Sequence, residues 1–155
     1  MYADEAQFFV TSTDADFQAT ARSACVASVY LTQNLANLYA RVRKEYVNSL
    51  LGNLQTKLFH QNADKETNHW AADTVSKVFF QRESTSVSTR VDDHDESTTT
   101  GTSTHLVLDY DLQSRAFLQL AKGGTPYNHV VTAILFQGGR WFPNGKIYIQ
   151  VAFTQ

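Results

Sequence analysis

Short apolar runs alternate with longer segments of helical periodicity through the first half of the chain. Residues 26–31 and 54–60 are apolar and partly β-branched, and each is short enough for a buried parallel strand. Between them, the apolar residues of segment 35–51 recur at helical spacing, and Gly52 suits the end of a helix. Strands that alternate with helices are typical of βα units. The sequence therefore predicts an α/β fold with a parallel sheet.

Two further helices are indicated by acidic residues that precede helical patterns. Asp14 or Asp16 can cap a helix that runs to about Cys25, because a carboxylate accepts hydrogen bonds from the first free amides of a helix. Asp64 can cap a later helix in the same way. The apolar stripe expected on that later helix consists of Ala71, Val75, Val78 and Phe79.

The pattern changes after residue 82. Residues 83–105 are dominated by Ser, Thr and charged residues without periodic apolar positions, which predicts a mobile loop. We therefore expect residues 1–82 and 106–155 to belong to the same domain, interrupted by this loop.

The last part of the chain is expected to return to regular structure. A short helix is predicted over 109–121. Two strand-like runs, 129–137 and 146–153, are joined by a segment that contains Gly138-Gly139 and Asn144-Gly145, and this arrangement predicts a terminal β-hairpin.

Composition restricts the classes of function. Thirteen basic and fifteen acidic residues leave a net charge of −2, so no overall field attracts the chain to nucleic acid or to an anionic membrane. Cys25 is the single cysteine, which excludes a disulfide within the chain and favours a reducing compartment. No apolar run approaches the ~20 residues of a membrane span. We expect a soluble, cytoplasmic chain.

Several motifs together resemble one family. Asp4-Glu5-Ala6-Gln7-Phe8-Phe9 resembles the Walker B region of TraG/TraD-type coupling proteins, the motor ATPases of conjugation and type IV secretion. The similarity spans nearly the whole chain apart from the Ser/Thr-rich segment. Its other parts are residues 19–23 with 29–34, 53–59 with 62–64 and 71–73, and Gly123-Gly124 with 136–140 and 144–146.

This resemblance implies a hexameric, RecA-like motor at the cytoplasmic face of the inner membrane, which uses ATP and Mg²⁺ to deliver a relaxase–DNA complex to the secretion channel. The family also carries a P-loop, but the pattern G-x-x-x-x-G-K-[ST] does not occur here, and Lys122-Gly123-Gly124-Thr125 has the wrong order. We therefore expect the C-terminal part of the motor domain: a partial RecA-like parallel sheet that lacks the P-loop strand. Residues 26–31 and 54–60 are then expected to pair directly.

The resemblance also assigns roles to four residues. Asp4 would hold Mg²⁺ through water and Glu5 would polarise the attacking water, Arg22 would be an arginine finger that reaches a neighbouring subunit, and Gln33 would sense the phosphate. The alternatives are a solvated acidic pair, a surface arginine on a helix, and a structural glutamine at the edge of a sheet. Without the N-terminal half of the motor, we expect this chain alone to bind no nucleotide or metal and to hydrolyse no ATP.

Two other functions remain open. A non-catalytic binding module could use the segment 83–105 and the terminal hairpin to dock secretion substrates or a relaxosome accessory protein. A nucleic-acid-binding module is disfavoured by the charge balance and by the lack of a base-reading motif.

Overall fold

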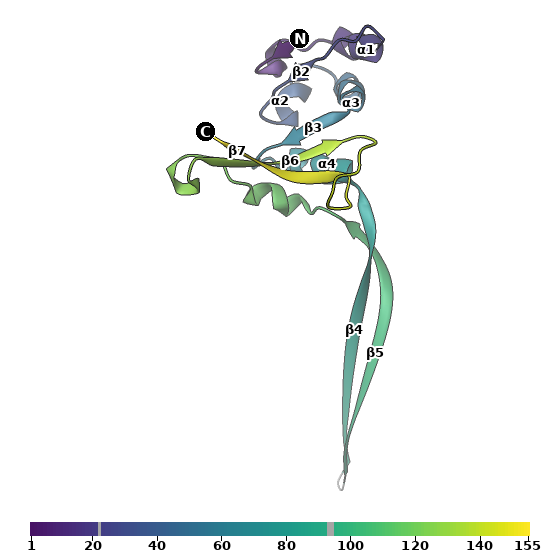
Figure 1. Ribbon diagram of the computed structural model, residues 1–155. Helices are drawn as coiled ribbons and strands as arrows, with labels where there is room; N and C mark the ends of the chain where they lie inside the picture. Colours follow the sequence, from purple (N-terminus) through teal and green to yellow (C-terminus); the bar gives the residue numbers. More distant parts are fainter. Residues whose placement is uncertain (22, 93–94) are drawn as a thin grey trace.

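The described residues form three small sheets and several short helices. The computed structural model describes the backbone of residues 1–21, 23–92 and 95–155 and the side chains of 1–21, 23–88 and 98–155. Figure 1 shows an N-terminal group of helices on one side of a central sheet, and a long hairpin that projects from the other side. The strands are β1 Tyr2–Ala3, β2 Val29–Tyr30, β3 Thr56–Phe59, β4 Lys77–Asp92, β5 Asp95–Tyr110, β6 Val130–Gln137 and β7 Tyr148–Thr154. The helices are α1 Ser12–Ala21, α2 Leu35–Tyr39, α3 Lys44–Asn53 and α4 Lys65–Val75, with 3₁₀ turns η1 Ala6–Phe8, η2 Ser114–Gln119 and η3 Thr125–Tyr127.

The N-terminal part is built on a short parallel pair. β1 and β2 lie side by side, with Tyr2 opposite Val29 and Ala3 opposite Tyr30. Helices α1, α2 and α3 pack beside this pair and share one apolar core with it. The core residues are Ala6, Val10, Ala15, Leu35, Leu38, Val47 and Leu50.

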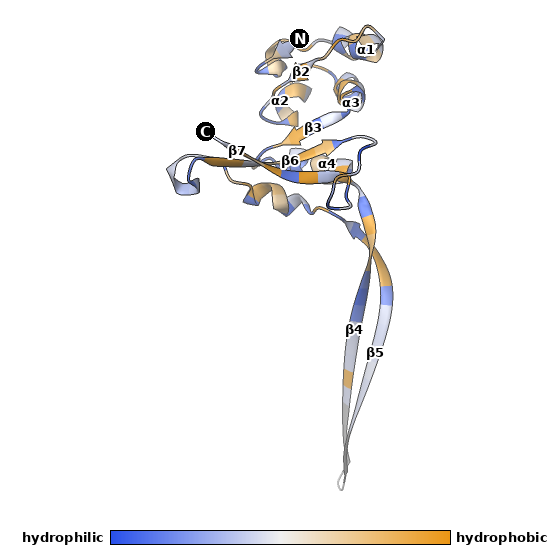
Figure 2. Cartoon of the chain, in the orientation of Figure 1, coloured by the Kyte–Doolittle hydropathy of each residue, from blue (hydrophilic) through white to orange (hydrophobic). Residues whose placement is uncertain are grey.

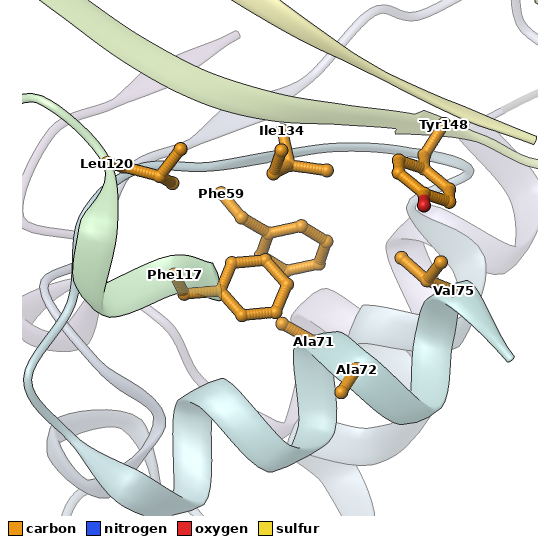
Figure 3. Close-up of a cluster of buried hydrophobic side chains, with 8 residues drawn as sticks. All are labelled: Phe59, Ala71, Ala72, Val75, Phe117, Leu120, Ile134 and Tyr148. Atoms are coloured by element: carbon orange, nitrogen blue, oxygen red, sulfur yellow. The ribbon is translucent and has the colours of Figure 1, made fainter. Parts of the chain in front are cut away.

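The central sheet is antiparallel, with strand order β3-β6-β7. Helix α4 and the turn η2 cover one face of it, and Figure 3 shows Phe59 and Phe117 between the sheet and α4. The Phe59 ring meets the rings of Trp70 and Phe117 edge to face, with centroids 5.6 and 5.7 Å apart. Trp70 contacts both cores and so joins the two parts of the molecule.

Two predicted features are confirmed. The terminal hairpin is present as β6 and β7, which pair from Val130 opposite Thr154 to Phe136 opposite Tyr148. Asp64 caps α4, because its carboxylate accepts the Thr67 amide at 2.9 Å. The α/β class is also confirmed in its general sense. The parallel RecA-like sheet is not found, since β1–β2 is the one parallel pair among the described residues.

The mobile loop predicted over 83–105 is wrong. Residues 83–92 and 95–105 lie in β4 and β5, two strands of 16 residues each that pair in unbroken register from Lys77–Tyr110 to Asp92–Asp95. Residues 93 and 94 lie outside the described residues. Threonine favours the extended backbone, and hydroxyl pairs such as Ser84–Ser103, at 2.8 Å, stabilise neighbouring strands. The apolar alternation of a half-buried strand is missing because most of this ribbon packs against nothing (Figure 1).

The predicted pairing of segments 26–31 and 54–60 is also wrong. β2 pairs with β1, whereas β3 pairs with β6 in a different sheet. The loops that follow the two segments are instead connected by a hydrogen bond from the Asn62 side-chain amide to the Gln33 carbonyl.

Helix limits differ from the prediction at three places. The helix expected over 35–51 is divided into α2 and α3, because Arg43 is extended (ψ 142°) and redirects the chain so that both helices reach the same core. Helix α4 ends at Val75, since Ser76 takes a left-handed φ of 84°, and Val78 and Phe79 therefore lie on β4. The helix expected over 109–121 is reduced to η2.

The first helix begins earlier than predicted. Asp14 lies in the first turn of α1, and its carboxylate accepts the amide and the hydroxyl of Thr11 at 2.8 and 2.9 Å. This is the reciprocal contact of a capping box, so Asp14 stabilises the start of the helix from inside it.

Candidate functional site

The candidate site lies where β1 and β2 end. Because the two strands are parallel, the residues that follow them, Asp4-Glu5 and Thr32-Gln33, emerge at the same edge. Two backbone hydrogen bonds fix this arrangement: Leu31 donates its amide to Ala3 at 2.9 Å, and Ala6 donates its amide to Leu31 at 2.7 Å.

Glu5 is the centre of a polar network at this edge. Its backbone is left-handed (φ 51°, ψ 49°), which ends β1 sharply and starts η1. One carboxylate oxygen accepts the Gln33 side-chain amide at 3.2 Å, and the other accepts the amide of Gln7. The buried Gln7 in turn accepts the Thr32 hydroxyl at 2.9 Å. Amide donors therefore surround a half-buried carboxylate.

Asn62 connects this network to the end of β3. Its side-chain amide donates to the Gln33 carbonyl at 2.6 Å, and its side-chain oxygen accepts the Asp64 amide at 2.8 Å. The buried Asn68 donates to the Asn62 carbonyl at 2.9 Å and so holds this loop in place. We call Glu5, Gln7, Thr32, Gln33 and Asn62 the carboxyl-end cluster.

Hydrogen bonds at the start of α4 hold the segments that carry the cluster in place. Thr67 accepts the Leu35 amide at 2.9 Å with its hydroxyl and donates that hydroxyl to Asp64 at 2.5 Å. The Thr67 hydroxyl, helped by the Thr67 amide, lowers the pKa of Asp64. The ionised Asp64 orients the Thr67 hydroxyl, and Thr67 joins α4 to α2 through the Leu35 amide.

One exposed carboxylate beside the carboxyl-end cluster could contribute to a metal site. Asp4 is exposed beside Glu5, and one of its oxygens accepts the Glu5 amide at 2.9 Å. Mg²⁺ is commonly held by one or two carboxylates, several waters and substrate phosphates, a ligand set to which Asp4 could contribute. The described side chains contain no group of three or more His, Cys, Asp or Glu residues suited to a metal. The sequence has no P-loop, so the residues present do not supply a phosphate cradle.

The structure brings three of the four predicted residues together. Asp4, Glu5 and Gln33 share one edge, as expected for residues that follow adjacent parallel strands, but their catalytic roles stay predictions. Arg22 lies outside the described residues. Sequence reasoning missed Gln7, Thr32 and Asn62 as cluster members. All three belong to motifs that carried the family resemblance, and that was the available signal.

No helix within the described residues is both long and apolar enough to cross a membrane.

Comparison with known proteins gives one match. A family model described as the TraM recognition site of TraD and TraG matches residues 1–114, which include the carboxyl-end cluster and both strands of the long hairpin. No curated protein matches the chain. The match covers well over half of the sequence and agrees with the resemblance of the motifs to TraG/TraD-type coupling proteins. The chain therefore belongs to the TraG/TraD family of conjugation coupling proteins, as a C-terminal part of that type.

Proposed function

We propose that this chain is the part of a conjugative coupling protein that recognises a TraM-type accessory protein of the relaxosome. The observation that carries this proposal is the match of residues 1–114 to the family of TraM recognition sites. In a complete system the coupling protein would hand the relaxase–DNA complex to the type IV secretion channel at the cytoplasmic face of the inner membrane. Its partners would then be proteins of the relaxosome and of the channel.

An aromatic patch within the matched region suits a protein partner. Phe8 and Phe9 are consecutive, and their side chains are 64% and 68% exposed. The Arg41 guanidinium lies over the Phe8 ring, 5.3 Å from its centroid. Aromatic side chains, phenylalanine among them, and arginine are enriched in protein interfaces relative to the rest of the surface. We therefore place the accessory-protein contact at Phe8, Phe9 and Arg41.

Binding of the purified chain to the TraM-type protein of the same conjugation system tests this assignment. Calorimetry should show saturable binding, and Phe9→Ser should weaken it about tenfold or more, the loss typical of one central interface residue. Trp141→Ser is the matched control, because Trp141 is also an exposed aromatic residue but lies outside the matched region. Absence of binding, or equal loss with both variants, contradicts the proposal.

We also infer that a further strand completes the sheet between β2 and β3. The amides of Val29 and Leu31 are bonded to β1, so strand alternation turns the Tyr30 amide to the opposite, open edge. β3 is itself an edge strand of the order β3-β6-β7. Val29, Leu31 and Leu58 are 46%, 40% and 43% exposed, which is expected of apolar strand residues when the layers that cover a completed parallel sheet are absent. The resemblance makes the P-loop strand, from the N-terminal half of the motor, the natural occupant.

A nucleotide site would form at the carboxyl-end cluster only when that strand is supplied. Bound Mg²⁺ and ATP would contribute charge neutralisation and the reacting phosphate. In such a site Asp4 would hold water on the metal and Glu5 would orient the attacking water. Gln33 would fix the Glu5 carboxylate, with which it forms a hydrogen bond in the chain alone. Arg22 is proposed as the finger toward a neighbour in a hexameric ring. The chain alone is expected to hydrolyse no ATP.

Reconstitution tests the nucleotide proposal. The chain is mixed with the P-loop-bearing part of the same coupling system, and phosphate release is measured. Activity should require both parts and should be lost with Glu5→Gln. Hydrolysis by the chain alone, or activity in the mixture that survives Glu5→Gln, contradicts it.

A further inference from the structure

The base of the long hairpin carries an unusual set of exposed side chains. In an antiparallel ribbon, residues that are directly paired lie on the same face, and alternate residues of each strand share that face. Phe79 pairs with Leu108, and Gln81 pairs with Leu106, so these side chains occupy one face. Phe79, Leu106 and Leu108 are 69%, 70% and 54% exposed. Covering these apolar side chains would lower the free energy of the molecule. Figure 2 shows most of the apolar bands of β4 and β5 near the body of the molecule, with one further band farther out on β4.

The opposite face is less exposed, with Val78 and Phe80 each 39% exposed, and it carries polar contacts within the chain. Arg82 and Asp109 form an ion pair there at 3.0 Å, and Ser84 bonds Ser103 farther out. Val107 is partly buried, and Phe80 is less exposed than its neighbour Phe79. The most exposed apolar side chains at the base of the hairpin therefore lie on one face, which we call the ribbon patch: Lys77, Phe79, Gln81, Glu83, Leu106 and Leu108. Within this patch Lys77 also lies over the ring of its paired residue Tyr110, 4.5 Å from the centroid.

The ribbon patch carries one positive and one negative charge at opposite ends. Lys77 lies at its inner end and Glu83 at its outer end, each three residues from Phe80 along β4. When a second ribbon is laid on this face in the reverse direction, Lys77 of each copy comes opposite Glu83 of the other. The same operation places Leu106 of one copy against Leu108 of the other. A twofold interface requires this kind of self-complementarity.

We propose that the ribbon patch binds a second copy of this chain. Two apolar faces cover each other in a twofold pair, and two Lys77–Glu83 ion pairs close its ends and fix its direction. A two-stranded ribbon alone in water is marginally stable, and a second ribbon on its apolar face supplies the missing burial. Nucleic acid and anionic membranes do not suit the surface, because the hairpin contains more acidic than basic residues. This proposal is independent of accessory-protein binding and of nucleotide chemistry.

The contact is small, so the association is expected to depend on concentration. A patch about seven residues long on two strands is well below the ~800 Å² per partner of a standard interface. We therefore expect sedimentation velocity to show monomer at about 1 µM and dimer at several hundred µM, as a weak complex should. Leu106→Ser should weaken the dimer about tenfold, the loss typical of a central apolar contact. Trp141→Ser, in an equally exposed residue elsewhere, should leave it unchanged.

Charge reversal gives a test that folding defects cannot imitate. Lys77→Glu and Glu83→Lys each place like charges opposite one another and should raise the dissociation constant severalfold at low salt. The double variant restores two opposite-charge pairs and should recover the wild-type value. The proposal is overturned if the chain is a monomer at every concentration or if Leu106→Ser leaves the dimer unchanged. It is also overturned if the double variant does not recover the wild-type dissociation constant. A patch that stays monomeric but is covered by the accessory protein also overturns it.

Discussion

Phe117 supports the central core, and its truncation should be the most damaging single change in the molecule. Its side chain is fully buried between β3, β6 and α4, and its ring packs edge to face on Phe59 at 5.7 Å. Phe117→Ala removes this burial, leaves a cavity and breaks the aromatic contact. Substitutions of this kind cost about 3–5 kcal/mol of unfolding free energy. The neighbouring Leu118→Ala, in a side chain that is 50% exposed, should cost less than about 1 kcal/mol.

Urea denaturation followed by circular dichroism measures this difference. With a slope on the order of 2 kcal/mol per molar urea, Phe117→Ala should lower the midpoint by roughly 2 M, while Leu118→Ala should hardly move it. The slope itself should be unchanged, since the surface exposed on unfolding is the same. Equal midpoints for the two variants would refute the assignment of η2 to the core.

Three further predictions concern backbone strain and titration. Gly52→Ala should raise stability by about 0.5–1 kcal/mol, because Gly52 lies in α3 and an added Cβ meets nothing within 4 Å. Gly123→Ala should lower the melting temperature, because the φ of Gly123 is +85° and the added Cβ would collide with Gln155 and Val131. Partial burial lowers the pKa of the largely exposed His60, so stability should fall slightly as pH drops from 6.5 through the folded pKa, and His60→Gln should flatten that shallow slope in pH-dependent melts. The lowered pKa of Asp64 gives stability that is present above about pH 4 and lost as pH falls through the folded pKa; Asp64→Asn should abolish this acid dependence.

The sequence predicted the parts of the fold in which the local pattern of apolar residues matches the burial of those residues in the structure. The terminal hairpin was predictable because β6 is mostly apolar and at least partly buried along its whole length, and glycines mark the turn region that follows it. The long hairpin was not, because a ribbon exposed on both faces needs no apolar alternation, and its Ser/Thr-rich composition is also typical of disorder. Its signal was the β-branched threonines in both halves of the segment.

The candidate site was partly predictable for a related reason. Asp4 and Gln33 follow two strands that the family resemblance predicts to be adjacent. Because those strands are parallel, their carboxyl ends meet and the two residues come close together. Gln7 and Asn62 join the cluster only through the way η1 and the β3–α4 loop fold back. No periodicity encodes such contacts between segments distant in sequence.

Amide hydrogen exchange tests most directly the claim that β2 and β3 flank the position of another strand. The Gly138 amide donates to the Gln55 carbonyl, so the antiparallel alternation turns the Phe59 amide toward β6 and the Leu58 amide toward the open edge. In the chain alone, Tyr30 and Leu58 should exchange at least about tenfold faster than Leu31 and Phe59, since only the latter are hydrogen-bonded. Equal protection of all four amides would show that both edges are already covered and would contradict the account.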